Sequence, residues 1–293
     1  MLDRSKGIVI AAAMIGLWGG GGYVAYSSWN AGVVRGRDGC PKDITKIASS
    51  TILLIDRTDA LYGDGQGLSE AVGRIADALA ENARLAVHVF GAKAELAAAP
   101  WKPPGGVAFS RCKTADPGQV SALTGNPRLV AKAYEQAFRG PLLAVVKAAA
   151  TISAPASASP IAESLEAALW SRSWEPRIAD RRIVIVSDLL QFTGGLNHMQ
   201  GLADVCGVAV QGIVRRLRAR QFAGSKVSLV YLRNPAHAAV QGAAHLRWWT
   251  TLFKLAGATE VAEGSRRLEE RTACTAAPGN GTSTQKTAKG GSR

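Results

Sequence analysis

The sequence lacks the short motifs that mark common classes of active site. Its four cysteines, at positions 40, 112, 206 and 274, are too far apart to form a Cys-x-x-Cys metal or redox motif. It has no Gly-x-Ser-x-Gly elbow and no phosphate-binding Gly-x-x-x-x-Gly-Lys. No cysteine lies in a local signature with a histidine partner. We therefore expect a protein that is not an enzyme.

Acidic residues are also scarce, because 22 Asp and Glu stand against 35 Lys and Arg, which gives a formal net charge of +13. Such a charge favours nucleic acid, an anionic membrane surface or an acidic protein as a partner. Nucleic acid stays possible but has no motif to support it, since no helix-turn-helix, zinc-finger or aromatic RNA-binding pattern occurs. The basic group at 215–220 is typical of a solvated helix end.

Charged residues are absent from the whole stretch 7–34. Residues 7–29 are long enough to cross a bilayer, which takes about 20 residues. We expect this stretch to be a transmembrane anchor, with a cleaved signal peptide as the alternative. Basic residues flank it on both sides, so they do not decide its orientation.

The number of cysteines is relevant to the cellular compartment in which the domain lies. Four cysteines can form two disulfides with three possible connectivities if the domain lies outside the cytoplasm, and four free thiols if it does not. The high Ala, Gly and Arg usage suggests a bacterial source. Together with the single anchor, this predicts a single-pass protein of the inner membrane with its domain in the periplasm.

The rest of the chain alternates buried strands with helices. Hydrophobic residues make up 47% of the sequence, enough for a packed core. We expect an N-terminal tail (1–6), the anchor, a linker (30–48), one domain (49–274) and a disordered tail (275–293). Apolar runs predict strands at 51–55, 84–90, 107–109, 183–186, 226–232 and 260–262. Helical periodicity predicts helices at 68–82, 128–150, 161–170, 202–220 and 236–256. This order is typical of a doubly wound α/β fold with a mostly parallel sheet flanked by helices.

Three details refine these elements. Pro141 should kink or split the helix over 128–150. His88 falls inside a strand, where a core histidine is far more common than a ligand. Trp248 and Trp249 point about 100° apart on a helix, so we expect one in the core and the other exposed at a contact surface.

Oxygen-bearing side chains gather at predicted strand ends. Asp56 and Thr58 follow the first strand, Asp188 follows the strand at 183–186, and Ser159 precedes a helix in a good capping position. The carboxyl ends of neighbouring parallel strands meet at one edge of the sheet. Carboxylates and hydroxyls are hard ligands suited to Mg²⁺, or to Ca²⁺ or Mn²⁺. We therefore expect a divalent metal at Asp56, Thr58, Ser159 and Asp188.

Over residues 50–262 the chain resembles a von Willebrand factor type A domain. That family's metal-ion-dependent adhesion site has Asp-x-Ser-x-Ser after the first strand, a Thr before a later helix and an Asp after the fourth strand. Asp56 and Thr58 match the first two positions, Ala60 stands where the third would be, and Ser159 and Asp188 match the Thr and the last Asp. The resemblance implies a non-catalytic module whose metal engages an acidic residue of a protein partner.

The first interpretation is therefore an anchored module that binds or scaffolds proteins of a bacterial envelope complex. A metal-dependent phosphohydrolase using Asp56 and Asp188 is an alternative, although Asp-Arg-Thr-Asp lacks the Asp-x-Asp of haloacid-dehalogenase phosphatases. A basic protein that binds nucleic acid or anionic lipid is the other alternative, and its affinity would fall steeply with salt.

Overall fold

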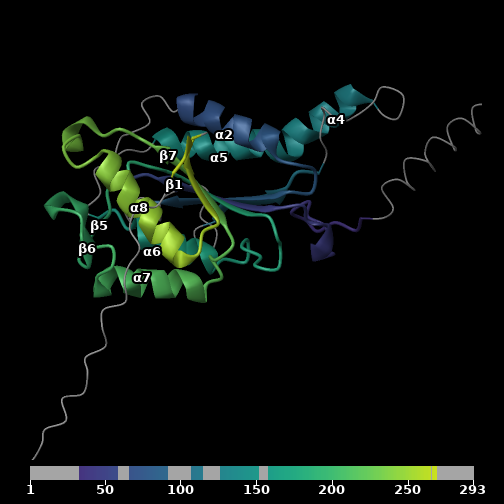
Figure 1. Ribbon diagram of the computed structural model, residues 1–293. Coiled ribbons are helices and arrows are strands. Elements are labelled where there is room, and N and C mark those ends of the chain that lie inside the picture. Colours follow the sequence, from purple (N-terminus) through teal and green to yellow (C-terminus); the bar gives the residue numbers. More distant parts are fainter. Residues whose placement is uncertain are drawn as a thin grey trace, which may run out of the picture.

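A mixed, mostly parallel sheet forms the centre of the domain (Figure 1). The computed structural model describes residues 33–58, 66–91, 107–114, 126–151, 158–264 and 266–268. Within these ranges the sheet has seven strands in the order β3-β2-β1-β4-β7-β8-β9. The strands are β1 (Ser50–Asp56), β2 (Arg84–Phe90), β3 (Val107–Cys112), β4 (Arg181–Ser187), β7 (Lys226–Tyr231), β8 (Glu260–Glu263) and β9 (Arg266–Arg267).

The strand directions confirm the predicted doubly wound sheet. β1 pairs in parallel with β2 on one side and β4 on the other, and β4, β7 and β8 continue in parallel. Only the outer strands β3 and β9 are antiparallel to their neighbours in this sheet. Every residue of β1 is buried, as expected of a parallel strand covered on both faces.

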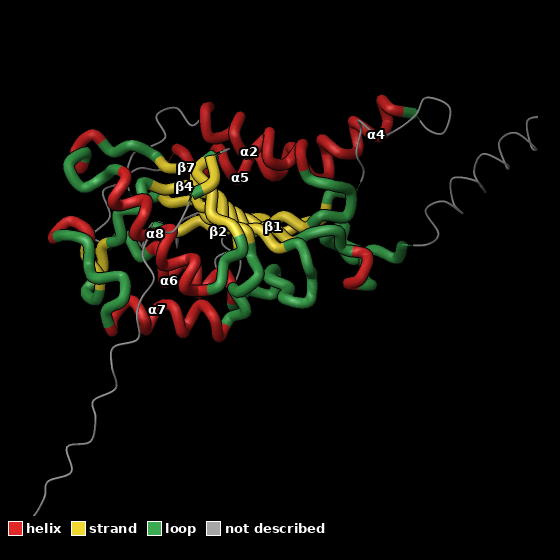
Figure 2. Tube along the Cα trace, viewed as in Figure 1, coloured by secondary structure: helices red, strands yellow, loops and turns green. Residues whose placement is uncertain are grey.

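Helices cover both faces of the sheet, as Figures 1 and 2 show. On one face, Leu53 and Ile55 share a core with α2 (Gln66–Ala78) and α5 (Gly140–Thr151). On the other, Ile52 and Leu54 pack with α6 (Ile161–Leu169), α7 (Val208–Ala219) and α8 (Ala243–Ala256). This division follows from the alternation of side chains along a strand.

The helix predicted over 128–150 is split, as expected from Pro141. It consists of α4 (Pro127–Tyr134), one π-helical turn (Glu135–Arg139) and α5. A Cβ on Gly140 would lie 2.8 Å from the carbonyl oxygen of Glu135, so the turn needs glycine at this position. The break lets α4 project from the end of the domain (Figure 1).

The N-terminal segment (residues 33–48) is packed against the domain, although we expected a linker over 30–48. A disulfide joins Cys40 to Cys112 at the end of β3. Ile47 is buried in the same small apolar cluster. The segment contains one 3-10 turn, Ile44–Lys46, capped by the side chain of Asp43. The chain is therefore attached to the domain well before β1 begins.

Other elements also depart from the sequence predictions. At residues 192–200, between β4 and α7, no element was predicted, but the chain forms a hairpin of β5 (Phe192–Thr193) and β6 (Leu196–Asn197), followed by the 3-10 turn His198–Gln200. The helices α7 and α8 begin six and seven residues later than predicted. A separate 3-10 turn, Pro235–His237, precedes α8.

The prediction of an exposed tryptophan is wrong, because both Trp248 and Trp249 are buried. Trp248 donates its indole N–H to the carbonyl of Ala203, and Trp249 donates to that of Leu189. The helix α8 is covered by the sheet on one side and by the chain around Ala203 on another, so adjacent positions are both enclosed. His88 is buried as expected and lies 3.2 Å from the hydroxyl of Ser173.

Several predictions concern residues outside the described ranges: the anchor at 7–29, Ala60, Cys274 and the tail at 275–293. Among the helices that are described, none has the length and apolar character needed to cross a bilayer. Cys206, like Cys40 and Cys112, is disulfide-bonded. The free-thiol alternative is therefore wrong for these three cysteines.

Candidate functional site

The candidate site lies where the chain changes direction across the sheet. β1 has β2 on one side and β4 on the other, so successive connections leave it in opposite directions. The register pairs Ile55 with Val186, which places Asp56 beside Ser187 at the carboxyl ends of these two strands. Open α/β sheets bind their ligands at such a switch point.

Asp56 is fully buried at this position. Its Oδ1 accepts hydrogen bonds from the backbone N–H of Thr58 at 2.8 Å and from the Thr58 hydroxyl at 2.6 Å. Its Oδ2 accepts from the hydroxyl of Ser187 at 2.6 Å. The pKa of the Asp56 carboxyl is raised to about 7, mainly by burial and also by the negative charge of Asp188, against the lowering effect of the Ser187 and Thr58 donors.

Thr58 and Ser159 come together although 101 residues separate them, with their hydroxyl oxygens 3.2 Å apart. Ser159 is held there by a short antiparallel bridge to Phe192, with N–H to carbonyl distances of 2.8 and 3.0 Å. The β5–β6 hairpin therefore positions this hydroxyl.

Ser159 is not a helix cap, contrary to our expectation. The first residue before α6 is Pro160, which makes no side-chain capping bond. Instead the side-chain carbonyl of Gln191 accepts a hydrogen bond from the N–H of Ala162 at 3.0 Å. The capping function is supplied from another part of the chain, which leaves the Ser159 hydroxyl to face Thr58.

Asp188 lies one residue beyond Ser187 and is also buried. Its Oδ1 accepts from the N–H of Leu190 at 2.9 Å, and its Oδ2 accepts from the side-chain amide of Asn234 at 3.1 Å. The amide of Gln241 donates to its backbone carbonyl at 3.0 Å. Asn234 follows β7, so three neighbouring strand ends contribute to the cluster.

The structure thus joins Asp56, Thr58 and Ser159 through direct contacts, and places Asp188 next in the chain to a residue that binds Asp56. Sequence reasoning missed the roles of Ser187, Gln191 and Asn234. Asn234 could have been found from the sequence, because it follows a predicted strand as Asp56 and Asp188 do. Nothing in the sequence marked Gln191, because its role depends on the approach of a distant helix end.

The donor chemistry of this cluster fits a hard divalent cation. It consists of two carboxylates and the hydroxyls of Thr58, Ser159 and Ser187, all of them oxygen donors. Hydroxyls that donate their protons to Asp56 keep oxygen lone pairs for another partner. Within the described ranges, no group of three His, Cys, Asp or Glu side chains could hold a metal, so any cation here would depend on these hydroxyls.

A chain of hydrogen-bonded rings, two of them buried histidines, lies next to the cluster. His198 Nδ1 is 3.0 Å from His245 Nε2, and His245 Nδ1 is 2.8 Å from the Tyr231 hydroxyl. Burial lowers the pKa of His198 to about 3 and that of His245 to about 4, because both imidazoles are removed from water. Both rings are therefore neutral at physiological pH.

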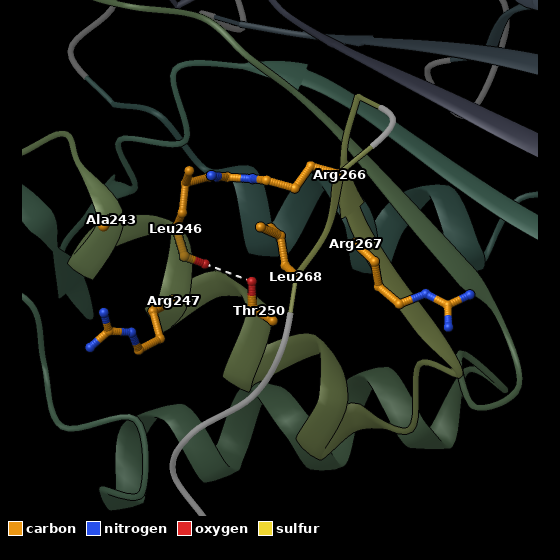
Figure 3. Close-up of a pocket in the computed structure, with 7 residues that line it drawn as sticks. All are labelled: Ala243, Leu246, Arg247, Thr250, Arg266, Arg267 and Leu268. Carbon is orange, nitrogen blue, oxygen red and sulfur yellow. Dashed lines mark hydrogen bonds between the residues drawn. The ribbon is translucent and has the colours of Figure 1, made fainter.

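A separate pocket of about 340 Å³ lies between α8 and the end of the described chain (Figure 3). Two of its arginines form ion pairs with residues that do not line the pocket: Arg266 pairs with Glu263, and Arg267 pairs with Glu260. In Figure 3 the side chains of Arg247 and Arg267 point away from one another. The residues lining this pocket include none of the four predicted ligands.

Comparisons with known proteins give one distant structural likeness and no family. No protein-family model matches the chain, and no curated protein matches it. Among solved structures, an aerotolerance-related membrane protein from Bacteroides fragilis is similar to this chain. The similarity covers 75% of this chain and 92% of that chain, at 12% sequence identity and a TM-score of 0.37. A likeness at this level carries no argument about function.

Proposed function

We propose that this protein is a membrane-anchored, non-catalytic binding module similar to von Willebrand factor type A domains. In this proposal a divalent cation, Mg²⁺ or else Ca²⁺ or Mn²⁺, is held by Asp56, Thr58, Ser159 and Asp188. The contact between the hydroxyls of Thr58 and Ser159, beside Asp56 at the switch point, is the observation that carries it. These are the positions that the resemblance assigns to the metal.

A cation held by two carboxylates and neutral hydroxyls attracts a further anionic oxygen from outside. The proposed ligand is an acidic side chain of a protein partner in a bacterial envelope complex. Within this chain, Ser187 and Asn234 orient the two carboxylates by donating hydrogen bonds to them. The predicted anchor at 7–29 would hold the module in the inner membrane, with the domain in the periplasm.

Metal binding is tested by calorimetric titration of Mg²⁺ and Mn²⁺ into the full chain in detergent. Ser159→Ala removes one proposed ligand, and Asp188→Asn weakens another. Ser164→Ala is the matched control, because it removes a serine hydroxyl only five residues away, within α6. We expect the two site variants to lose roughly tenfold or more in affinity and the control to lose nothing. Equal affinity in Ser159→Ala and Ser164→Ala would refute the assignment.

Partner binding is tested by affinity capture from native membranes, with and without EDTA. The proposal expects a protein that is retained by the wild-type chain in Mg²⁺ and released by EDTA. Ser159→Ala should fail to retain it, and Ser164→Ala should retain it. A partner that stays bound through both chelation and Ser159→Ala would show that binding does not use this cluster.

A further inference from the structure

The helix α4 exposes an apolar residue between two cations at the tip of the domain. Leu129 is 65% exposed, and Arg128 and Lys132 are exposed beside it. The helix contains no acidic residue, and Tyr134 at its end is the buried residue that fixes it to the domain. An exposed leucine flanked by basic side chains is typical of a helix that rests on an anionic membrane surface.

The N-terminal segment presents the same chemistry. Val34 is 65% exposed, and Arg37, Lys42 and Lys46 are exposed along the segment. The segment cannot swing freely away from the domain, because the Cys40–Cys112 disulfide fixes it to β3.

Contacts to α2 place both features at one end of the molecule. The Tyr134 hydroxyl donates to Asp77 at 2.8 Å, near the C-terminal end of α2. Four residues further on, Glu81 pairs with Arg35 of the N-terminal segment at 3.4 Å. Figure 1 shows α4 and the purple start of the described chain at the same, right-hand end.

Three acidic groups at this end are engaged in internal pairs, whereas Asp43 of the N-terminal segment is exposed and accepts hydrogen bonds from Thr45. Asp77 also pairs with Arg139 at 3.3 Å, and Glu135 pairs with Arg139 at 3.5 Å. Glu81 pairs with Arg35, as above. The helix α4 itself carries Arg128 and Lys132 and no acidic residue, so its exposed side is complementary to an anionic surface.

The candidate metal site lies at the opposite end of the sheet. The strand β2 begins at Arg84, shortly after Glu81, whereas Asp56 and Ser187 are the last residues of β1 and β4. A strand of seven residues such as β1 spans about 23 Å at ~3.3 Å per residue.

The length of the tether brings the α4 end to the bilayer. The predicted anchor ends at residue 29 and the described chain begins at residue 33. Four residues reach about 14 Å at most when fully extended. We propose that α4 and the N-terminal segment together form a docking surface for an anionic phospholipid bilayer, which holds the candidate metal site on the far side of the domain. This inference uses the anchor of the proposed function but not its metal.

The docking is tested with the full chain in lipid vesicles. Leu129→Cys is labelled with an environment-sensitive fluorophore, and lipids carrying a nitroxide near the headgroup serve as the quencher. Val208→Cys is the matched control, because Val208 is 86% exposed at the start of α7, which packs on the other face of the sheet. Cys40, Cys112 and Cys206 are disulfide-bonded, and the unmutated chain treated with the same reagent gives the background.

The expected result is quenching of the label at 129 but not at 208 in vesicles that contain phosphatidylglycerol. The quenching should be lost with Arg128→Glu and Lys132→Glu combined, and should weaken in high salt because exposed charges are then screened. Quenching at 129 no stronger than at 208 overturns the proposal. Both positions are exposed, so their labels do not disturb the core, and circular dichroism verifies the fold.

Two further measurements separate this proposal from the proposed function. Alkaline carbonate washing tests the anchor, because an integral chain stays with the vesicles. Mn²⁺ titration of the charge-reversed variant tests the metal, and unchanged affinity is expected since the two ends of the sheet are independent. A label at 129 that is quenched only after a protein extract is added would identify a protein partner instead of the bilayer and would refute the docking surface.

Discussion

At the scale of single residues, the most consequential side chain is Asp56, because its burial makes its charge costly. Its pKa is raised to about 7 in the folded chain, against an ordinary value of 3.8 in the unfolded chain. Between these values the folded state binds a proton that the unfolded state has released, so stability falls as pH rises. A cation beside the Asp56 carboxylate would stabilise its ionised form and so offset this loss of stability.

The pH dependence of stability in EDTA therefore gives a direct test. We expect Asp56→Asn to be more stable than the wild type at pH 8, by roughly 2–4 kcal/mol for a shift of about three pKa units. Near pH 4 the two proteins should be equally stable. Chemical denaturation of the full chain in detergent measures the difference. A variant that is less stable than the wild type at pH 8 would contradict the buried-charge argument.

The two buried histidines predict the opposite dependence of stability on pH. His198 and His245 have pKa values lowered to about 3 and 4 by burial, below the ordinary value of 6.5. Below pH 6.5 the two histidines are therefore protonated in the unfolded chain but remain neutral in the folded chain. The free energy of unfolding then decreases as the pH falls towards 4.

Each histidine should lower the free energy of unfolding by about 1.4 kcal/mol per pH unit in that window. His198→Gln is expected to reduce the proton uptake on unfolding at pH 5 by about one proton. Denaturation at several pH values between 5 and 7 measures that uptake as a slope. An unchanged slope in the variant would mean that His198 is already protonated in the folded state.

At the scale of elements, two short segments position the parts of the molecule used in the proposals. They are the β5–β6 hairpin and the N-terminal segment. The hairpin holds Ser159 through the bridge to Phe192, and Gln191, directly before the hairpin, caps α6. The N-terminal segment is fixed through a disulfide that closes a loop of 72 residues. One element shapes the site, and the other fixes the opposite end of the domain.

Removing the disulfide should therefore cost stability without affecting the site. Cys40→Ser combined with Cys112→Ser is expected to lower the free energy of unfolding by about 2–4 kcal/mol, the typical range for a disulfide. Thermal unfolding of the full chain measures this loss. Mn²⁺ affinity serves as the control and should stay at the wild-type value. A loss of metal affinity equal to that of Ser159→Ala would show that the two ends are coupled.

At the scale of the whole molecule, the parallel strands of the sheet were predictable because each is a short, continuous apolar run, whereas the order of the strands in the sheet was not predicted. The strand ends then supplied Asp56, Thr58 and Asp188, since the carboxyl edge of the sheet follows from the fold. The disulfide pairing, the capping by Gln191 and the burial of both Trp248 and Trp249 were not predictable. Each depends on which distant segments meet, and local periodicity carries no information about that.

The arrangement of the two ends also has a mechanical consequence. The N-terminal segment leads directly into β1, and Asp56 of the candidate site is the last residue of that same strand. In the proposed arrangement, a pull between the anchor and a bound partner would act along β1, which is hydrogen-bonded to β2 and β4 on its two sides. Such a load shears both ladders at once and does not peel them open one bond at a time. The Cys40–Cys112 link passes part of the same load to β3, so tension would be shared across four neighbouring strands.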